Sequence, residues 1–353
     1  MDIESLEFRA ACIQAARNFF IAHGYLELDT PALASALIPE SCLEVFRADY
    51  LKPFKTDEQA HIPLFLTPSP EVFIKPIIAQ HKRSVFQLSK CYRNVEAVGA
   101  IHHPEFTMLE YYTMHADYKD SILLTENFLQ AMVQAAKPLA VADQSACEII
   151  AQPFLQLTMD EAFKRYAGFS LAEASSPQAL AAQAEHLGLG PYAQYEQWAW
   201  DDLYELLLVH CIEPQLPLHR PVALIDYPAR VPCLAQEQSE YYLTSAGTPV
   251  EWKTKQRWEV YINGVELANC YTEERDASAI DQYVQQEAAL KAQTARVPHP
   301  LVQNFGELCA QMPPCSGTAL GFDRLIMLLA GKTSLAPFLH RNSIQHIELS
   351  LHK

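Results

Sequence analysis

The stretch Pro313-Pro314-Cys315-Ser316-Gly317-Thr318-Ala319-Leu320-Gly321-Phe322-Asp323-Arg324-Leu325-Ile326-Met327-Leu328-Leu329 joins small residues to an apolar helical pattern. Because glycine has no Cβ, Gly317 and Gly321 allow a ligand to approach the backbone closely. The guanidinium of Arg324 offers a rigid fork of donors that suits phosphate. The apolar run after it would bury the helix that carries this arginine. Taken alone, the stretch fits equally well an ordinary helix start capped by Asp323.

The composition favours a globular enzyme without a large basic surface. Half of the 353 residues are hydrophobic, which is enough for a sizeable core, and chains of this length often fold as one elaborated domain. The 42 acidic and 26 basic residues give a net charge of −16. A chain with this charge repels bulk polyanions, although a local basic pocket for ATP remains compatible with it.

The remaining global features indicate a cytoplasmic protein. The nine cysteines include no Cys-x-x-Cys pair, so neither a disulfide framework nor a zinc site is expected, and reduced thiols are the simplest interpretation. The N-terminal Met1-Asp2-Ile3-Glu4 has no signal-peptide pattern. No apolar run is long enough to span a bilayer, so we expect no membrane association.

Periodicity predicts the order of helices and strands. Residues 5–23 have helical spacing and end at Gly24, and residues 25–30 form a short strand. Two strand-like runs, 84–94 and 103–114, flank a short loop, and a helix follows at 118–136. Further helical patterns at 159–166, 177–187 and 198–210 predict a helical insertion at approximately residues 138–220.

A hairpin is predicted at Asn263-Gly264, because Asn-Gly between alternating strands is a strong turn signal. A two-residue turn pairs Tyr261 with Glu266 and puts Glu259 on the same face as Tyr261. Glu259 and Glu266 would then lie diagonally, roughly 7–8 Å apart at the backbone. They could share Mg²⁺, which prefers a few carboxylates plus phosphate oxygens; the alternative is a solvated strand face. Strict alternation puts Asn269 opposite to Glu266, unless a bulge intervenes.

Three segments resemble the motifs of the class II aminoacyl-tRNA synthetases. The opening stretch resembles motif 3, the runs 90–94 and 104–112 resemble the two arms of motif 2, and the helix–Gly–strand segment ending at Pro31 resembles motif 1. The resemblance implies an α+β fold, in which helices flank an antiparallel sheet of six or seven strands. It also implies a homodimer formed through motif 1, with the catalytic residues Arg93 and Arg324 holding the phosphates of ATP.

Within that class, Glu266-Leu267-Ala268-Asn269 resembles the elongation factor P–(R)-β-lysine ligases, truncated relatives of lysyl-tRNA synthetase. The similarity runs over nearly the whole chain. Because the chain begins at the motif 1 helix, we expect a single catalytic domain over residues 1–353 and no anticodon-binding domain. Ser69, before Pro70-Glu71, and Ala319, where a synthetase typically has glycine, favour the ligase branch.

The resemblance implies roles for individual residues. The substrate's amino groups would be surrounded by acidic and polar side chains, which suit a diamino cation. This amino-acid site would comprise Ser69, Glu71, Glu266, Asn269, Tyr271, Glu273 and Ala319. The ATP site would comprise Arg93, Glu96, His102, Glu259, Gly321 and Arg324. The metal ligands would be Glu259 and Glu266, with ATP as substrate and Mg²⁺ as cofactor.

Several positions depart from the family pattern. Motif 2 reads Arg93-Asn94-Val95-Glu96 where the family has Arg-x-Glu, so either Glu96 shifts in to meet the adenine or that contact is lost. The loop is one residue longer than expected, and Ile101 stands where a polar residue is usual. His102 or His103 would have to replace the missing basic contact. Beside the pocket, Cys270 replaces a glycine and Tyr271 a phenylalanine.

The expected activity is ATP-dependent activation of lysine or (R)-β-lysine as an adenylate, followed by transfer to a lysine of elongation factor P. Alternatives are a different amino acid or acceptor (a tRNA, a carrier protein or a small molecule), or a non-catalytic paralogue. The net charge argues against extensive tRNA binding. Lys253, Lys255 and Arg257 would meet an acidic partner at the active-site mouth. The sequence leaves open which amino acid and which acceptor are used.

Overall fold

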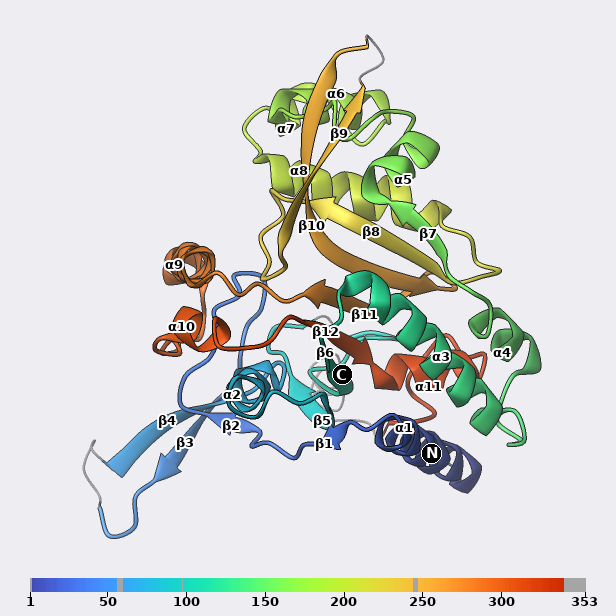
Figure 1. The fold of residues 1–353 in the computed structure, drawn as a ribbon, viewed down its shortest axis with the longest axis vertical. Helices are drawn as coiled ribbons and strands as arrows, with labels where there is room; N and C mark the ends of the chain where they lie inside the picture. Colours follow the sequence, from blue (N-terminus) through green and yellow to red (C-terminus); the bar gives the residue numbers. More distant parts are fainter. Residues whose placement is uncertain (1, 56–59, 97, 244–246, 340–353) are drawn as a thin grey trace, which may run out of the picture.

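The computed structural model describes residues 2–55, 60–96, 98–243 and 247–339 (Figure 1). Its strands are β1 (Leu26–Glu27), β2 (Leu33–Ala34), β3 (Arg47–Leu51), β4 (His61–Leu66), β5 (Val85–Tyr92), β6 (Glu105–Met114), β7 (Leu155–Thr158), β8 (Val222–Pro228), β9 (Glu237–Leu243), β10 (Pro249–Ile262), β11 (Val265–Thr272) and β12 (Cys315–Gly321).

The helices of the described residues are α1 (Ile3–Ala22), α2 (Glu71–His81), α3 (Tyr118–Ala136), α4 (Gln144–Ile150), α5 (Met159–Tyr166), α6 (Pro177–His186), α7 (Tyr192–Tyr195), α8 (Trp200–Leu207), α9 (Ala277–Thr294), α10 (Phe305–Cys309) and α11 (Phe322–Leu329). A π-helical turn, Leu208–Ile212, and a 3-10 turn, Glu213–Gln215, continue α8.

One large sheet organises the molecule. In the described part of the chain it has nine strands in the order β1-β5-β6-β12-β11-β10-β8-β7, with β9 also paired to β10. The edge pairs β1–β5 and β7–β8 are parallel, and the other pairs are antiparallel. A separate small sheet has the order β2-β4-β3. The predicted α+β class is therefore confirmed, whereas the predicted count of six or seven strands is too low.

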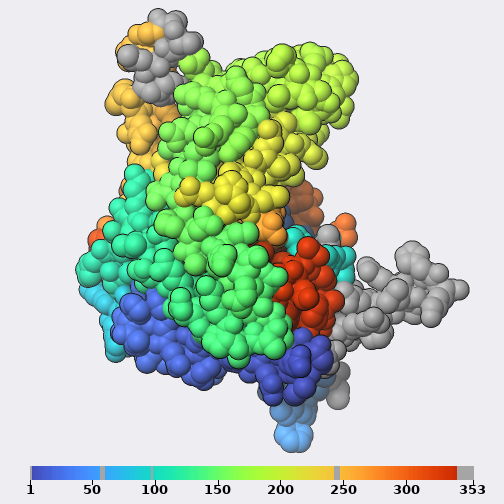
Figure 2. Space-filling model, turned by 90° about the vertical axis from the view of Figure 1, so that its right-hand side faces the viewer, coloured from blue at the N-terminus to red at the C-terminus, as the bar shows by residue number. Residues whose placement is uncertain are grey.

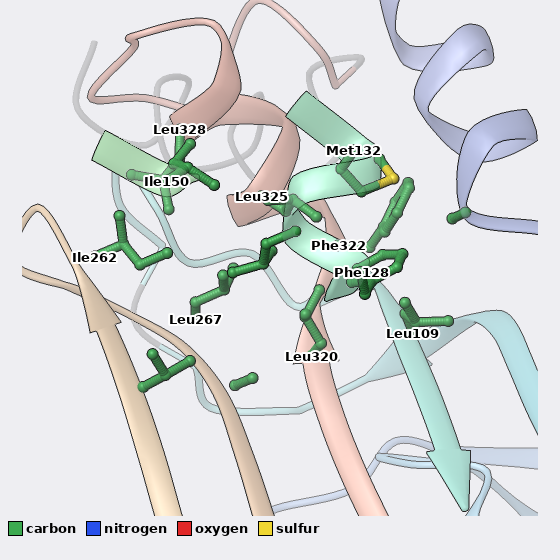
Figure 3. Packing of buried hydrophobic residues seen from close by; sticks show 14 of the residues in the cluster. Leu109, Phe128, Met132, Ile150, Ile262, Leu267, Leu320, Phe322, Leu325 and Leu328 are labelled. Carbon is green, nitrogen blue, oxygen red and sulfur yellow. The ribbon is translucent and has the colours of Figure 1, made fainter. Parts of the chain in front are cut away.

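Helices α1, α3, α4 and α11 cover one face of the sheet (Figure 1). Leu109, Leu267 and Leu320 come from three strands and point toward Leu325 of α11 and Phe128 of α3 (Figure 3). All five side chains are buried. Burying side chains of this size contributes roughly 1.5–3 kcal/mol each. This layer fixes α11, and hence Arg324, against the sheet.

The opposite face of the sheet stays partly open. Helices α2, α9 and α10 pack together at one end of it, through a smaller core that includes Ile78, Ile280 and Phe305. A third core joins α5, α6 and α8 to β7 and β8. Helices α5 to α8, together with parts of β9 and β10, make up the upper part of the surface, above the N-terminal helix (Figure 2). The open face between these groups carries the candidate site.

The local sequence signals located most helices closely. The helix predicted at 118–136 is α3, with Asp117 forming a capping box with Asp120. The helix predicted at 159–166 is α5, capped by Thr158 and Glu161. The one predicted at 198–210 is shorter, because α8 ends at Leu207 and changes to a π-helical turn. In the described residues, every helix is too short or too polar to cross a membrane.

Candidate active site

The floor of the site is β12, in which small residues alternate with larger ones. Gly317, Ala319 and Gly321 share one face, because side chains alternate along a strand. Ser316, Thr318 and Leu320 occupy the other face and are buried. The small residues leave room above β12. Side chains of the neighbouring strands β6 and β11 line this space on either side. The opening stretch of the sequence analysis thus builds the base of a binding site.

Cross-strand pairing lines up polar side chains over this floor. Glu110 of β6 pairs with Ala319, Ala319 pairs with Asn269 of β11, and Asn269 pairs with Glu259 of β10. Residues directly opposite each other in adjacent strands have Cβ atoms about 4.5–5.5 Å apart. Four strands therefore contribute one continuous row across the site. Of these residues, Ala319, Asn269 and Glu259 are predicted site residues.

A β-bulge resolves the conflict over Asn269. Tyr261 pairs with Glu266 as predicted, but Val260 pairs with Ala268, so Leu267 has no partner in β10. Leu267 and Ala268 are both buried in the core. The extra residue restores Glu266 to the face that carries Asn269. The predicted turn at Asn263-Gly264 is confirmed, and both of its residues have positive φ.

A cavity of about 180 Å³ lies at the junction of β6, β11, β12 and α11. Of the predicted ATP-site residues, it brings together Arg93, Glu96, His102, Gly321 and Arg324. Glu259, the sixth, lines a different cavity. The Arg324 guanidinium donates to the backbone oxygen of Glu266 (2.7 Å) and lies 3.5 Å from the carboxylate of Glu266.

His102 contacts Arg324 directly, with 2.7 Å between Nε2 of the ring and Nη2 of the guanidinium. Burial and the adjacent positive charge lower the pKa of His102. The ring is therefore neutral at pH 7 and accepts a hydrogen bond from the arginine. Burial also lowers the pKa of His103. In this structure, neither histidine supplies the positive charge expected to replace the missing basic residue of the loop.

Asp323 anchors the start of α11. Its carboxylate pairs with Arg9 of α1 at 2.6 Å and accepts from the backbone N–H of Thr107 at 2.7 Å. Arg9 also donates to the hydroxyl of Thr107 (2.8 Å). Asp323 is buried, so these hydrogen bonds offset the cost of removing its charge from water. The N-terminal helix, motif 2 and motif 3 are thereby joined next to Arg324.

The extra residue of motif 2 is accommodated by an unusual backbone conformation. Val95 is exposed and has a φ of 58°, a left-handed value that is strained for a β-branched residue. Asn94 forms an isolated bridge with Glu44, which holds the strand end in place. Glu96 then lies at the first cavity, where the predicted adenine contact would be. Ala97, the next loop residue, is outside the described residues.

A second cavity, of about 90 Å³, adjoins the first across Arg93, Asn269 and Ala319. It brings together six of the predicted amino-acid-site residues: Ser69, Glu71, Asn269, Tyr271, Glu273 and Ala319. Glu266 lines the first and third cavities instead.

Glu110 and Tyr112 also line this cavity, and the sequence analysis did not select them. Ser69 and Tyr112 donate to the two oxygens of the Glu110 carboxyl, at 2.7 and 2.9 Å. Burial raises the pKa of Glu110 to about 8, and the nearby Glu71 adds to the rise. Glu110 and Tyr112 lie on the face of β6 that carries the site. The available signal was an acid directly between the apolar pair Met108-Leu109 and the aromatic pair Tyr111-Tyr112.

Lys75 is a second feature that the sequence analysis missed. Its side chain is 1% exposed, and its ammonium contacts the carboxylate of Glu71 and lies 2.8 Å from that of Glu273. Burial by itself lowers the pKa of Lys75, but Glu273 and Glu71 raise it well above its ordinary value. Burial raises the pKa of Glu273 to about 7, against the attraction of Lys75. Lys75 therefore holds both acids in position.

Position 317 must be glycine because the side chain of Glu273 occupies the space that a Cβ would need. A Cβ at this position would be 2.1 Å from Oε1 of Glu273 and 2.6 Å from Cε1 of Tyr112. Both neighbours are buried, so neither can move away cheaply. The glycine thus lets the Glu273 carboxylate approach the backbone of β12 closely.

A third cavity, of about 560 Å³, lies on the β10 side and is lined by both predicted metal ligands, Glu259 and Glu266. Burial and the charge of Glu259 raise the pKa of Glu266. Burial by itself would raise the pKa of Glu259. Arg257 contacts this carboxylate and keeps the pKa of Glu259 below its ordinary value. Among the described residues there is no group of three or more metal-ligating side chains. Two like-charged carboxylates that face one cavity fit the donor set of a hard cation such as Mg²⁺, with phosphate completing it.

Arg93 lies where the three cavities meet, since it lines all of them. Its guanidinium packs over the ring of Phe106, 5.1 Å from the centroid. Its buried Nε has no hydrogen-bond partner within the described part of the chain. An orphaned donor next to a cavity fits an anionic ligand such as phosphate.

Comparison with known proteins identifies the family. The family model described as tRNA synthetases class II (D, K and N) matches residues 3–338. Proteins named elongation factor P–(R)-β-lysine ligase from Salmonella dublin, Salmonella heidelberg (strain SL476) and Salmonella agona (strain SL483) are each 32% identical to the chain over 335 residues. The alignments cover 95% of this chain and 93% of each relative. These findings confirm the resemblance seen in the motifs. The chain therefore belongs to the class II tRNA synthetases (D, K and N) and is an ATP-dependent amino-acid ligase.

Proposed function

We propose that the chain activates lysine or (R)-β-lysine with ATP and transfers the aminoacyl group to a lysine of elongation factor P. The observation that carries this proposal is the continuity of two cavities along β12. One contains Arg93 and Arg324, and the other contains buried acids. Such a site suits a nucleotide whose α-phosphate lies next to the carboxylate of a cationic amino acid.

The acidic cavity favours a substrate with two ammonium groups. Glu71, Glu110 and Glu273 line it, and Lys75 offsets part of their charge. Burial, together with the charge of Glu71, raises the pKa of Glu110 to about 8, and this exceeds the lowering by Lys75. A bound ammonium group would lower this pKa by favouring the charged carboxylate. Recognition of this kind distinguishes a diamino acid from a neutral one.

The chemistry needs positioning and charge stabilisation rather than a protein nucleophile. An oxygen of the substrate carboxylate attacks the α-phosphorus, the bond from this phosphorus to the bridging oxygen breaks, and pyrophosphate leaves. Arg93 and Arg324 stabilise the phosphate charge. When bound, Mg²⁺ supplies further positive charge there, and Glu259 and Glu266 hold it.

In the second step, an acceptor amine attacks the carbonyl carbon of the adenylate. An amide bond forms, the bond from the carbonyl carbon to the phosphate oxygen breaks, and AMP leaves. The amine loses a proton to solvent. Elongation factor P as acceptor is supported by the names of the Salmonella relatives. We further propose a cytoplasmic homodimer formed through α1, a helical insertion at about residues 138–220, and no extensive tRNA binding.

Amino-acid-dependent exchange of labelled pyrophosphate into ATP tests the first step, with α-lysine, (R)-β-lysine and unrelated amino acids compared. We expect exchange only with the lysines. Transfer is tested with ATP, labelled amino acid, purified elongation factor P and total tRNA in one mixture. Label on the protein supports the proposal, whereas label on tRNA alone contradicts it. If no amino acid supports pyrophosphate exchange, the result favours the alternative that this chain is a non-catalytic paralogue.

A further inference from the structure

The third cavity opens onto the proposed reacting centre. It shares Arg93, Asn269 and Tyr271 with the amino-acid cavity, and it shares Arg93, Asn269 and Glu266 with the ATP cavity. At about 560 Å³ it is larger than either of them. An amine that approached through it would reach the substrate from the β10 side.

The lining of this cavity is strongly acidic. Its described residues include eight carboxylates and only two arginines, Arg93 and Arg257. Arg257 is already in contact with Glu259. A concave surface lined mainly by one sign of charge focuses the electric field and attracts ligands of the opposite sign. The cavity therefore selects a cation.

Three of these acids lie together on α8. Asp201, Asp202 and Glu205 are exposed, and none of their side chains has a hydrogen bond or ion pair with another described residue. Asp201 and Glu205 are four residues apart, so they share one face of the helix. Partial loss of contact with water beside the cavity, followed by the charge of Glu259, raises the pKa of Glu205. These three side chains place like charges beside a cavity whose described lining has only Arg93 and Arg257 as cations.

Tyr204 gives independent evidence for a ligand. It lines the same cavity, is 1% exposed, and its ring stacks against Trp200 and Phe163. Its hydroxyl has no hydrogen-bond partner among the described residues. A buried hydroxyl is normally satisfied, so an unpaired one beside a cavity points to a partner supplied by a bound molecule.

We propose that this cavity receives a cationic, lysine-bearing segment of the acceptor protein, and that Asp201, Asp202 and Glu205 guide it to the adenylate. The proposal rests on the proposed function. It reverses the docking surface predicted from sequence: Arg257 is half-buried and contacts Glu259, and Lys253 and Lys255 lie near Glu237, at 3.3 and 3.8 Å. A polyanion such as tRNA would be repelled by the same acids.

The test removes the three charges without changing side-chain size, in Asp201→Asn, Asp202→Asn, Glu205→Gln. With labelled amino acid and purified elongation factor P, KM for the acceptor should rise about tenfold, because rim charges act mainly on association. Pyrophosphate exchange should stay unchanged. The control variant, Glu148→Gln, Glu196→Gln, Glu251→Gln, removes the same charge from exposed acids outside the cavity and should leave KM unchanged.

A second measurement uses the unaltered enzyme. Raising the salt concentration should increase its KM for the acceptor, because salt screens exposed charges beyond about 8–10 Å. The triple variant of Asp201, Asp202 and Glu205, called the α8 variant, should show a much smaller increase. An unchanged KM in the α8 variant, an equal rise in the control, or a parallel loss of exchange would overturn the docking proposal. Exchange absent from the unaltered enzyme would instead refute the proposed function, so the two failures are distinguishable.

Discussion

The buried Lys75 offers the sharpest test of how the site is held together. Lys75→Met keeps a flexible chain of similar length, so the change removes the charge without opening a large cavity. It leaves Glu71 and Glu273 close together without their shared cation, and Glu273 is only 2% exposed. Removing one partner of a buried ion pair costs about 3–5 kcal/mol. We expect a loss of that size in the free energy of unfolding at pH 8.5.

The loss should depend on pH. The pKa of Glu273 in the folded protein is raised to about 7, above its ordinary value of 4.5, and it should rise further without Lys75. A carboxyl with a raised folded pKa destabilises the protein progressively as pH rises through that value. Below about pH 6 Glu273 is protonated in both proteins, so the variant should lose less stability there.

Urea unfolding followed by circular dichroism, at one fixed protein concentration, measures both values. The matched control is Lys90→Met, because Lys90 forms an exposed pair with Glu105 at 3.5 Å. Pairs of this kind contribute only about 0–1 kcal/mol. Adding Glu273→Gln to Lys75→Met should restore stability at pH 8.5 but not at pH 6. A loss below about 1 kcal/mol, or one equal at both pH values, would refute the reasoning.

Four further results are expected. Arg324→Ala should reduce pyrophosphate exchange by about 10²–10³, as loss of a transition-state donor does, and unchanged exchange would contradict the phosphate role. Gly317→Ala should destabilise the protein by about 1–3 kcal/mol in urea unfolding and raise KM for the amino acid, because its methyl group would meet Glu273 at 2.1 Å. Glu266→Gln should raise the Mg²⁺ concentration for half-maximal exchange about tenfold, and an unaltered Mg²⁺ dependence would argue against metal binding there. Leu6 on α1 is 41% exposed. Leu6→Glu should therefore shift the proposed dimer toward the monomer in sedimentation experiments.

Local patterns in the sequence determined the motif strands, the turn at Asn263-Gly264 and the bounds of α3 and α5. These features depend on neighbouring residues, since a capping box or an Asn-Gly turn is specified within a few positions. Of the residues that the family motifs gave, five of the six for ATP line the first cavity, and six of the seven for the amino acid line the second. The short edge strand β7 was missed, because four residues specify no pairing by themselves.

Tertiary structure decided the rest of the site. The bulge at Leu267 depends on how β10 and β11 pair, and it alone puts Glu266 and Asn269 on one face. Lys75 and Glu273 are far apart in sequence, and neither signals that it would be buried in an ion pair. The third cavity combines residues of α8, α9 and the sheet. The burial of a side chain and the protonation state that it favours depend on its surroundings. Those surroundings come from segments that only folding brings together.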